Sequence, residues 1–259
     1  MSEIETQPRL PPALRSATGG ACLVVGAGVG LGSGLAHAFA ADGLEVCVTR
    51  RARNLDELTG LVAEIKAHGG KAHAFGVDAR SEDEMEGLFS TIEREIGPLE
   101  VVVFNIGANV RFPIAETTTR VFTKVWEMAC FAGFLAGREA AKVMTPRGRG
   151  TIIFTGATAS IRGREGLAAF AAAKHGLRAV AQSMARELGP KGIHVAHVVI
   201  DGGVDGAFIR SNRAAVDDLL AEDRILKPAD IAANYVWLHH QPRSAWTQEL
   251  DLRPWAEPW

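Results

Sequence analysis

Three glycines, Gly26, Gly30 and Gly32, follow a short apolar stretch and lead into a segment with helical periodicity that starts at Leu31. Their spacing is G-x-x-x-G-x-G, because the stricter G-x-G-x-x-G pattern fails in every register. Glycine lets the backbone approach a ligand closely, and the amides and dipole at a helix start attract a pyrophosphate. The stretch predicts a dinucleotide site. A surface turn without a ligand is the alternative.

Two further polar positions follow the next predicted strands. Arg50 stands where a site for NAD usually carries an acidic residue, and arginine there suits the 2′-phosphate of NADP. Its alternative role is a solvated basic residue at a helix start. Asp78 and Ala79 follow the third strand, where the carboxylate could meet an adenine amino group or cap the helix beginning near Ser81.

Asn105 and Gly107 follow the fourth predicted strand, and Lys174 lies on a later helix. With the glycine turn and Asp78, they make residues 20–252 resemble the short-chain dehydrogenase/reductase family. The resemblance implies hydride transfer between NAD(P) and an alcohol or carbonyl group of a small molecule. It also implies cofactor contacts at Gly26, Gly30, Leu31, Gly32, Arg50, Asp78, Ala79, Asn105, Gly107, Lys174, Gly202 and Val204.

The chain departs from that family in its catalytic residues. The family uses Asn, Ser, Tyr and Lys, with the tyrosine as general acid/base four residues before the lysine, on one helix face. Here Lys174 is kept, whereas Phe170, Ala157 and Cys130 stand at the Tyr, Ser and Asn positions. Gly206 replaces a threonine that would hold the carboxamide. The resemblance therefore implies an atypical member without the serine and tyrosine.

Two functions follow from this pattern. One is an NAD(P)-dependent oxidoreductase, NADP preferred, in which another group or water supplies the proton. The other is a catalytically silent nucleotide-binding or scaffold protein on the same fold. The only tyrosine, Tyr235, lies far from the lysine in sequence and cannot replace the acid by a shift of register. Side chains considered as replacement acids are Thr155, Thr158, Ser160, His175, Asp201 and Asp205, of which His175 is the weakest because it follows Lys174 directly.

Arginines after several strands would favour an anionic substrate group if they converged, although separate solvated side chains are the better interpretation. They are Arg111, Arg162, Arg164, Arg210 and Arg213.

Composition excludes several classes of protein. A net charge of −2 and a pI near 6.5 give no footprint for nucleic acid or an anionic membrane surface. No apolar run reaches the ~18 residues needed to span a bilayer, and the first residues lack a signal-peptide profile. We therefore expect a cytoplasmic protein. Metal and disulfide sites are not expected from the three scattered cysteines, from His194 and His197, or from the adjacent His239 and His240, whose faces should diverge.

Short apolar runs alternate with amphipathic segments, which predicts a single-domain, Rossmann-like α/β fold: a doubly wound parallel sheet with helices on both faces. The expected strands are 21–25, 45–49, 71–77, 99–104, 150–155, 193–200 and 247–252. The expected helices are 31–41, 54–68, 81–96, 117–144, 167–189 and 228–240. Residues 1–18 should form a flexible arm, and 19–259 the domain, with a substrate lid at about 204–227.

A homo-oligomer, dimer or tetramer, is expected to assemble through the carboxyl-terminal part of the chain. Tryptophans cluster there, at Trp237, Trp246, Trp255 and Trp259. The apolar residues of segment 117–144 should form core or subunit interface; they include Val121, Val125, Phe131 and Phe134.

Overall fold

A computed structural model describes residues 19–212 and 216–256. The predicted arm, Arg213 and Trp259 lie outside the described residues. The strands form one seven-stranded sheet in the order β3-β2-β1-β4-β5-β6-β7, and every neighbouring pair is parallel. Their bounds are β1 Ala21–Val25, β2 Glu45–Arg50, β3 Ala72–Gly76, β4 Leu99–Phe104, β5 Gly150–Thr155, β6 Ile193–Ile200 and β7 Glu249–Leu252.

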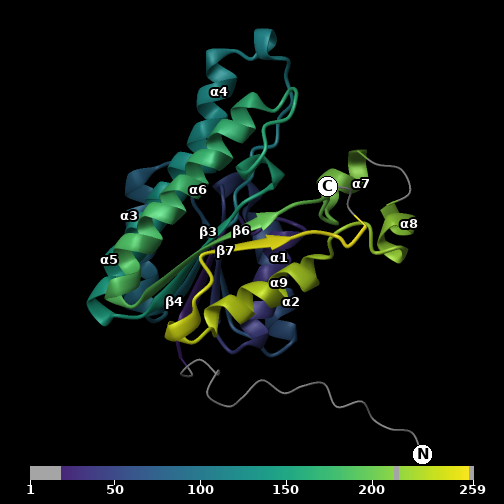
Figure 1. Cartoon of the computed structure of the whole chain (residues 1–259). Coiled ribbons are helices and arrows are strands. Elements are labelled where there is room, and N and C mark those ends of the chain that lie inside the picture. The colour runs from purple at the N-terminus through teal and green to yellow at the C-terminus, as the bar shows by residue number, and fades with distance from the viewer. Residues whose placement is uncertain (1–18, 213–215, 257–259) are drawn as a thin grey trace, which may run out of the picture.

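Helices cover both faces of the sheet (Figure 1). One core layer packs α3 (Glu82–Glu95), α5 (Ala132–Met144) and α6 (Ala168–Leu188) on the sheet through side chains such as Phe89, Leu135 and Leu177. The other packs α1 (Leu31–Ala41), α2 (Leu55–Ala67) and α9 (Pro228–His239) through Phe39 and Tyr235. A strand between two such layers is buried on both sides, as are all eight residues of β6, including His194 and His197.

The strand order reverses between β1 and β4, because β1 pairs with β2 on one side and β4 on the other. In an open α/β sheet the ligand crevice lies at this point, outside the carboxyl ends of the strands. The predicted doubly wound fold is confirmed, and the predicted boundaries of strands and helices differ from the observed ones by at most two residues outside segment 117–144.

Segment 117–144 is divided, whereas one uninterrupted helix was predicted. It contains α4 (Thr119–Trp126), a π-helical segment (Glu127–Phe131) and α5. Thr118 caps α4 by accepting a hydrogen bond from the Val121 amide at 3.2 Å. A π-turn displaces the side chains that follow it and is frequent at functional sites. Cys130 lies within this turn.

The predicted lid region is closed at its base and carries two short helices, α7 (Ala207–Asn212) and α8 (Val216–Ala221). Val204 and Leu226 form an isolated parallel bridge, and the Asp205 amide donates to the Leu226 carbonyl at 2.9 Å. Figure 1 places α7 and α8 apart from the helical layers, beyond the arrowheads of β6 and β7. A role as a lid remains a prediction.

His239 and His240 do not diverge as predicted: their ring centroids lie 4.9 Å apart at the end of α9. His240 Nε2 lies 2.8 Å from a carboxylate oxygen of Asp42, which caps the end of α1. Ligand-type atoms of these three residues fall within 4.8 Å of one another. The sequence argument failed because both helices end here and bring Asp42 against the pair.

No helix within the described ranges combines the length and apolar character needed to cross a membrane. The three cysteines are buried and unpaired.

Candidate active site

The glycine turn has the backbone that its sequence predicts. Gly26 and Gly30 have φ values of 94° and 104°, which side chains with a Cβ rarely adopt. A Cβ on Gly32 would lie 2.6 Å from the Gly26 carbonyl oxygen and 2.7 Å from Ala27 Cα, so only glycine lets α1 start this close to the turn that follows β1. Gly30 caps α1 without a side-chain acceptor. The helix start is therefore open to an anion.

Three contiguous pockets run from this turn along the carboxyl ends of the strands. The first, the Arg50 pocket, has a volume of about 220 Å³, and the second, the glycine pocket, about 390 Å³. The third, the Lys174 pocket, has about 300 Å³. The first two share Gly26, Gly28 and Asn105; the last two share Leu31, Asn109, Gly202 and Val204; Gly107 lines both the first and the third. Together they form one crevice.

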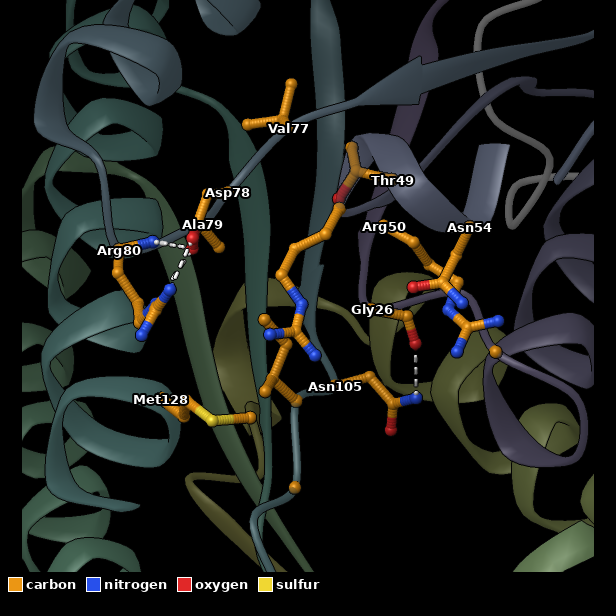
Figure 2. A pocket seen from close by; sticks show the side chains of 14 residues that line it. Gly26, Thr49, Arg50, Asn54, Val77, Asp78, Ala79, Arg80, Asn105 and Met128 are labelled. Carbon is orange, nitrogen blue, oxygen red and sulfur yellow. Dashed lines mark hydrogen bonds and ion pairs between the residues drawn. The ribbon is translucent and has the colours of Figure 1, made fainter. Parts of the chain in front are cut away.

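Figure 2 shows the Arg50 pocket. Asn105 donates from its side-chain amide to the Gly26 carbonyl at 3.1 Å, which ties the end of β4 to the glycine turn. Asp78 accepts from Arg80 Nε at 2.9 Å and also from Arg80 Nη2. The hydrogen bonds from Arg80 lower the pKa of the Asp78 carboxyl. Asp78 does not cap α3, because Ser81 is the cap and accepts from the Glu84 amide at 3.3 Å.

The basic side of this pocket has one residue that sequence reasoning missed. Arg50 lines the pocket, but its guanidinium forms an ion pair with Glu57. Arg51 lines the same pocket, and no hydrogen bond or ion pair engages its side chain within the described parts of the chain. Glu57 could have pointed to Arg51. It lies in the first turn of α2 and can neutralise only one of the two arginines, which leaves the other available to a ligand.

Lys174 is 2% exposed and lines the third pocket. Its Nζ donates to the Thr155 carbonyl at 2.8 Å and to the Ile106 carbonyl at 3.1 Å, so it joins the ends of β5 and β4. Burial lowers the pKa of Lys174 to about 8. Phe170, one turn earlier on α6, and Ala157 line the same pocket and offer it no polar side-chain atom.

Cys130 is buried beside α6, where a Cβ on Gly176 would lie 2.9 Å from its Sγ. Burial raises the pKa of the Cys130 thiol, against the lowering effect of the Lys174 charge. Cys130 does not line any of the three pockets of the crevice. The π-turn therefore places a neutral thiol behind the lysine.

Four of the six candidate replacement acids have side chains that are engaged by other groups of the protein. Thr155 Oγ1 lies 2.9 Å from the hydroxyl of Tyr235, which belongs to α9 on the face of the sheet opposite to α6. Ser160 is fully buried, and its Oγ accepts from the Ala157 amide at 3.1 Å. His175 is exposed, with Nδ1 2.9 Å from the Ala171 carbonyl oxygen of its own helix. Asp205 pairs with Arg210, whose Nε lies 2.7 Å from Oδ1.

The remaining two acids, Asp201 and Thr158, belong to one cluster. Asp201 is 1% exposed and accepts from Thr158 Oγ1 at 2.6 Å and from Arg162; Arg253 lies 3.2 Å from its second oxygen. Burial alone would raise the pKa of Asp201, but the bonds from Thr158 and Arg162 and the two arginine charges outweigh it and lower that pKa. Asp201 is therefore an ionised, structural carboxylate.

The arginines do not converge as one anion site. Arg162 and Arg164 line the Lys174 pocket, but Arg162 is paired with Asp201. Arg111 packs on Gly166, where a Cβ would lie 2.8 Å from its Cγ. Arg210 is paired with Asp205 and Asp217. Only Arg164 therefore offers the pocket a guanidinium without an ion pair to a described carboxylate.

The comparisons with known proteins agree with this geometry. Residues 21–216 match the family model described as short chain dehydrogenase. A crystal structure of a short-chain dehydrogenase from Rhodopseudomonas palustris is 51% identical and covers 91% of this chain and 99% of its own, with a TM-score of 0.77. Actinorhodin polyketide ketoreductase, solved as a variant with NADPH, is 25% identical and covers 91% of this chain and 96% of its own, with a TM-score of 0.82.

Among curated relatives, 2-dehydro-3-deoxy-D-gluconate 5-dehydrogenase of Formosa agariphila is 30% identical over 194 residues, which are 75% of this chain and 71% of that protein. These matches and the crevice at the strand ends lead to one assignment: the chain belongs to the short-chain dehydrogenase/reductase family of oxidoreductases.

Proposed function

We propose that this protein is an NAD(P)-dependent oxidoreductase that transfers hydride between the cofactor and a small carbonyl or alcohol substrate. The observation that carries the proposal is the continuity of the crevice, which joins an uncapped helix start at Gly30 to a buried lysine at Lys174. A crevice that joins an anion-binding helix start to a buried lysine fits a ligand long enough to reach both ends.

The residues of the crevice fit a dinucleotide. The close approach at Gly32, where a Cβ would meet backbone, leaves the α1 amides to hold the pyrophosphate. Asp78 and Ala79 would face the adenine, Asn105 and Gly107 would line the middle, and Lys174 would lie beside the nicotinamide ribose. Gly202 and Val204 would lie beside the carboxamide. The bound nicotinamide supplies or accepts the hydride.

NADP is the preferred cofactor in this proposal, and Arg51 is its recognition residue. A guanidinium that forms no ion pair with a described carboxylate can give its charge-assisted bonds to a 2′-phosphate, whereas Arg50 would first have to leave Glu57. Binding of NADPH by an actinorhodin ketoreductase variant of the same fold supports this preference. Arg51→Ala should weaken NADPH binding and spare NADH, with Arg50→Ala as the matched control.

The alternative is a catalytically silent nucleotide-binding or scaffold protein. It is supported by Phe170 and Ala157, which leave the pocket without the phenol and the hydroxyl of the family. Titration of NADPH and NADH by fluorescence, followed by turnover of a ketone, alcohol and activated-alkene panel with wild type and Lys174→Ala, separates the two. Binding without turnover across the panel would favour the silent protein, and no binding of either nucleotide would refute both.

A homo-oligomer and a cytoplasmic location complete the proposal. Trp237 and Trp255 are 46% and 82% exposed, and Trp126 is 40% exposed, which supports burial against other copies of the chain. Three buried, unpaired cysteines suit a reducing compartment. Light scattering during size-exclusion chromatography would give the number of copies.

A further inference from the structure

The Lys174 pocket contains few side chains that can release a proton. Among the side chains that line it, ionisable N–H groups belong to Arg162, Arg164 and Lys174. Arginine stays protonated in proteins and cannot act as an acid. The Thr158 hydroxyl donates to Asp201 at 2.6 Å, and Asn109 carries only an amide. Lys174 is thus the one lining side chain whose protonation state can change near neutral pH.

The position of Nζ is fixed on the protein side. Two of its three protons are directed at the carbonyl oxygens of Thr155 and Ile106, 2.8 and 3.1 Å away. Both acceptors are backbone atoms at the ends of adjacent strands, so the position of the ammonium does not depend on a flexible side chain. The third proton remains for a group bound in the pocket.

The charged and titratable groups around Lys174 do not compete for this role. The Cys130 thiol, from the π-turn, is the one whose charge acts on the lysine, and burial keeps it protonated. His197 of β6 feels the Lys174 charge, but its Nδ1 lies 3.0 Å from Glu249 and its ring is fully buried. Among the described residues, no carboxylate or hydroxyl bonds to the Lys174 ammonium, which donates to the two backbone carbonyls.

We propose that Lys174 is itself the general acid of this enzyme and delivers the substrate proton that a tyrosine at position 170 would otherwise deliver. This inference rests on the proposed oxidoreductase function. As hydride reaches the carbonyl carbon, the carbonyl oxygen takes a proton from Nζ, which becomes a neutral amine and is reprotonated by solvent. In the oxidative direction the neutral amine accepts the hydroxyl proton. A pKa of about 8 suits both directions, because an acid works best near the ambient pH.

The test compares wild type with Lys174→Arg, which keeps the cation but cannot lose a proton. The probes are NADPH with 2,3-hexanedione and phenylglyoxylate. Reduction by wild type should be flat at low pH and fall about tenfold per pH unit above pH 8. Lys174→Arg should bind NADPH within a few fold of wild type but lose about 100-fold or more in kcat. Lys174→Arg with Phe170→Tyr should recover part of that loss, and Lys191→Arg, at the surface, is the control.

A second readout needs no turnover. The 13Cε resonance of Lys174, assigned by its absence from Lys174→Arg, should titrate with a midpoint near pH 8 in the protein without cofactor. A midpoint above pH 10, or a Lys174→Arg enzyme that keeps wild-type kcat and pH profile, would overturn the proposal while leaving the oxidoreductase intact. Loss of NADPH binding, or no turnover of any probe by wild type, would instead remove the proposed function and this inference with it.

Discussion

Replacing Lys174 by methionine should change how stability depends on pH. Folding lowers the pKa of Lys174 from 10.5 to about 8, roughly 2.5 units, and each unit corresponds to about 1.4 kcal/mol. Below pH 8 the folded and unfolded states both carry the proton. Between pH 8 and 10.5 the unfolded state binds more protons than the folded state, so stability rises with pH. Wild type should therefore gain about 3 kcal/mol over this range relative to Lys174→Met.

The sign of the slope is diagnostic, whereas the stability at pH 7 alone is not. Methionine removes the cost of the buried charge but leaves the carbonyls of Thr155 and Ile106 without their donor, which costs about 1–3 kcal/mol each. These costs do not vary with pH. Other groups with a raised pKa, such as Tyr235 and Cys47, titrate in both proteins and cancel in the difference.

The assay is urea unfolding of wild type and Lys174→Met at intervals from pH 7 to 10.5, with Lys191→Met as the control for removing an exposed lysine. The difference in free energy of unfolding between wild type and Lys174→Met should change steadily above pH 8, and the control should run parallel to wild type. Parallel curves for all three proteins would mean that the Lys174 ammonium keeps its ordinary pKa, and the reasoning from burial would be wrong.

Three other changes test separate parts of the crevice. Phe170→Tyr with Ala157→Ser should raise kcat/KM for ketone reduction by about 100-fold, measured with NADPH; no gain in a folded, cofactor-binding variant would show a different pocket geometry. Arg51→Ala should weaken NADPH about 10- to 100-fold by fluorescence titration while NADH stays unchanged, and equal weakening of both would contradict the 2′-phosphate role. Gly32→Ala should cost about 1–3 kcal/mol and abolish nucleotide binding, whereas Gly60→Ala, with open space on α2, should gain about 0.5–1 kcal/mol in a thermal melt.

The parallel sheet was predictable because it depends on patterns that burial enforces. Strands such as β1 lie between two helical layers, so all five residues of β1 are apolar, and glycines mark where helices stop. Gly32 was predictable for the same reason, since its lack of a Cβ is required by contact with the turn that follows β1. At such positions the residue that the local sequence pattern predicts is also the residue that the packing requires.

The features that the sequence did not reveal depend on contacts between separate segments of the chain. Arg50 and Arg51 are alike in sequence, and only the placement of Glu57 separates them. His239 and His240 were assigned to diverging faces, yet the end of α1 brings Asp42 to them. The π-turn at Cys130 has no local signature, because its extra residue is accommodated by packing against α6.

Asp201 links the carboxyl-terminal segment of the described chain to the crevice through an ion pair with Arg253. Arg253, just beyond β7, bridges Asp201 and Asp251, and a Cβ on Gly202 would lie 2.7 Å from Pro254. The segment around Arg253 and Pro254 thus packs behind Gly202, which lines the crevice where the proposed nicotinamide would bind. A fusion, cleavage or neighbouring subunit that displaced this segment would therefore alter the proposed hydride transfer without touching cofactor or substrate.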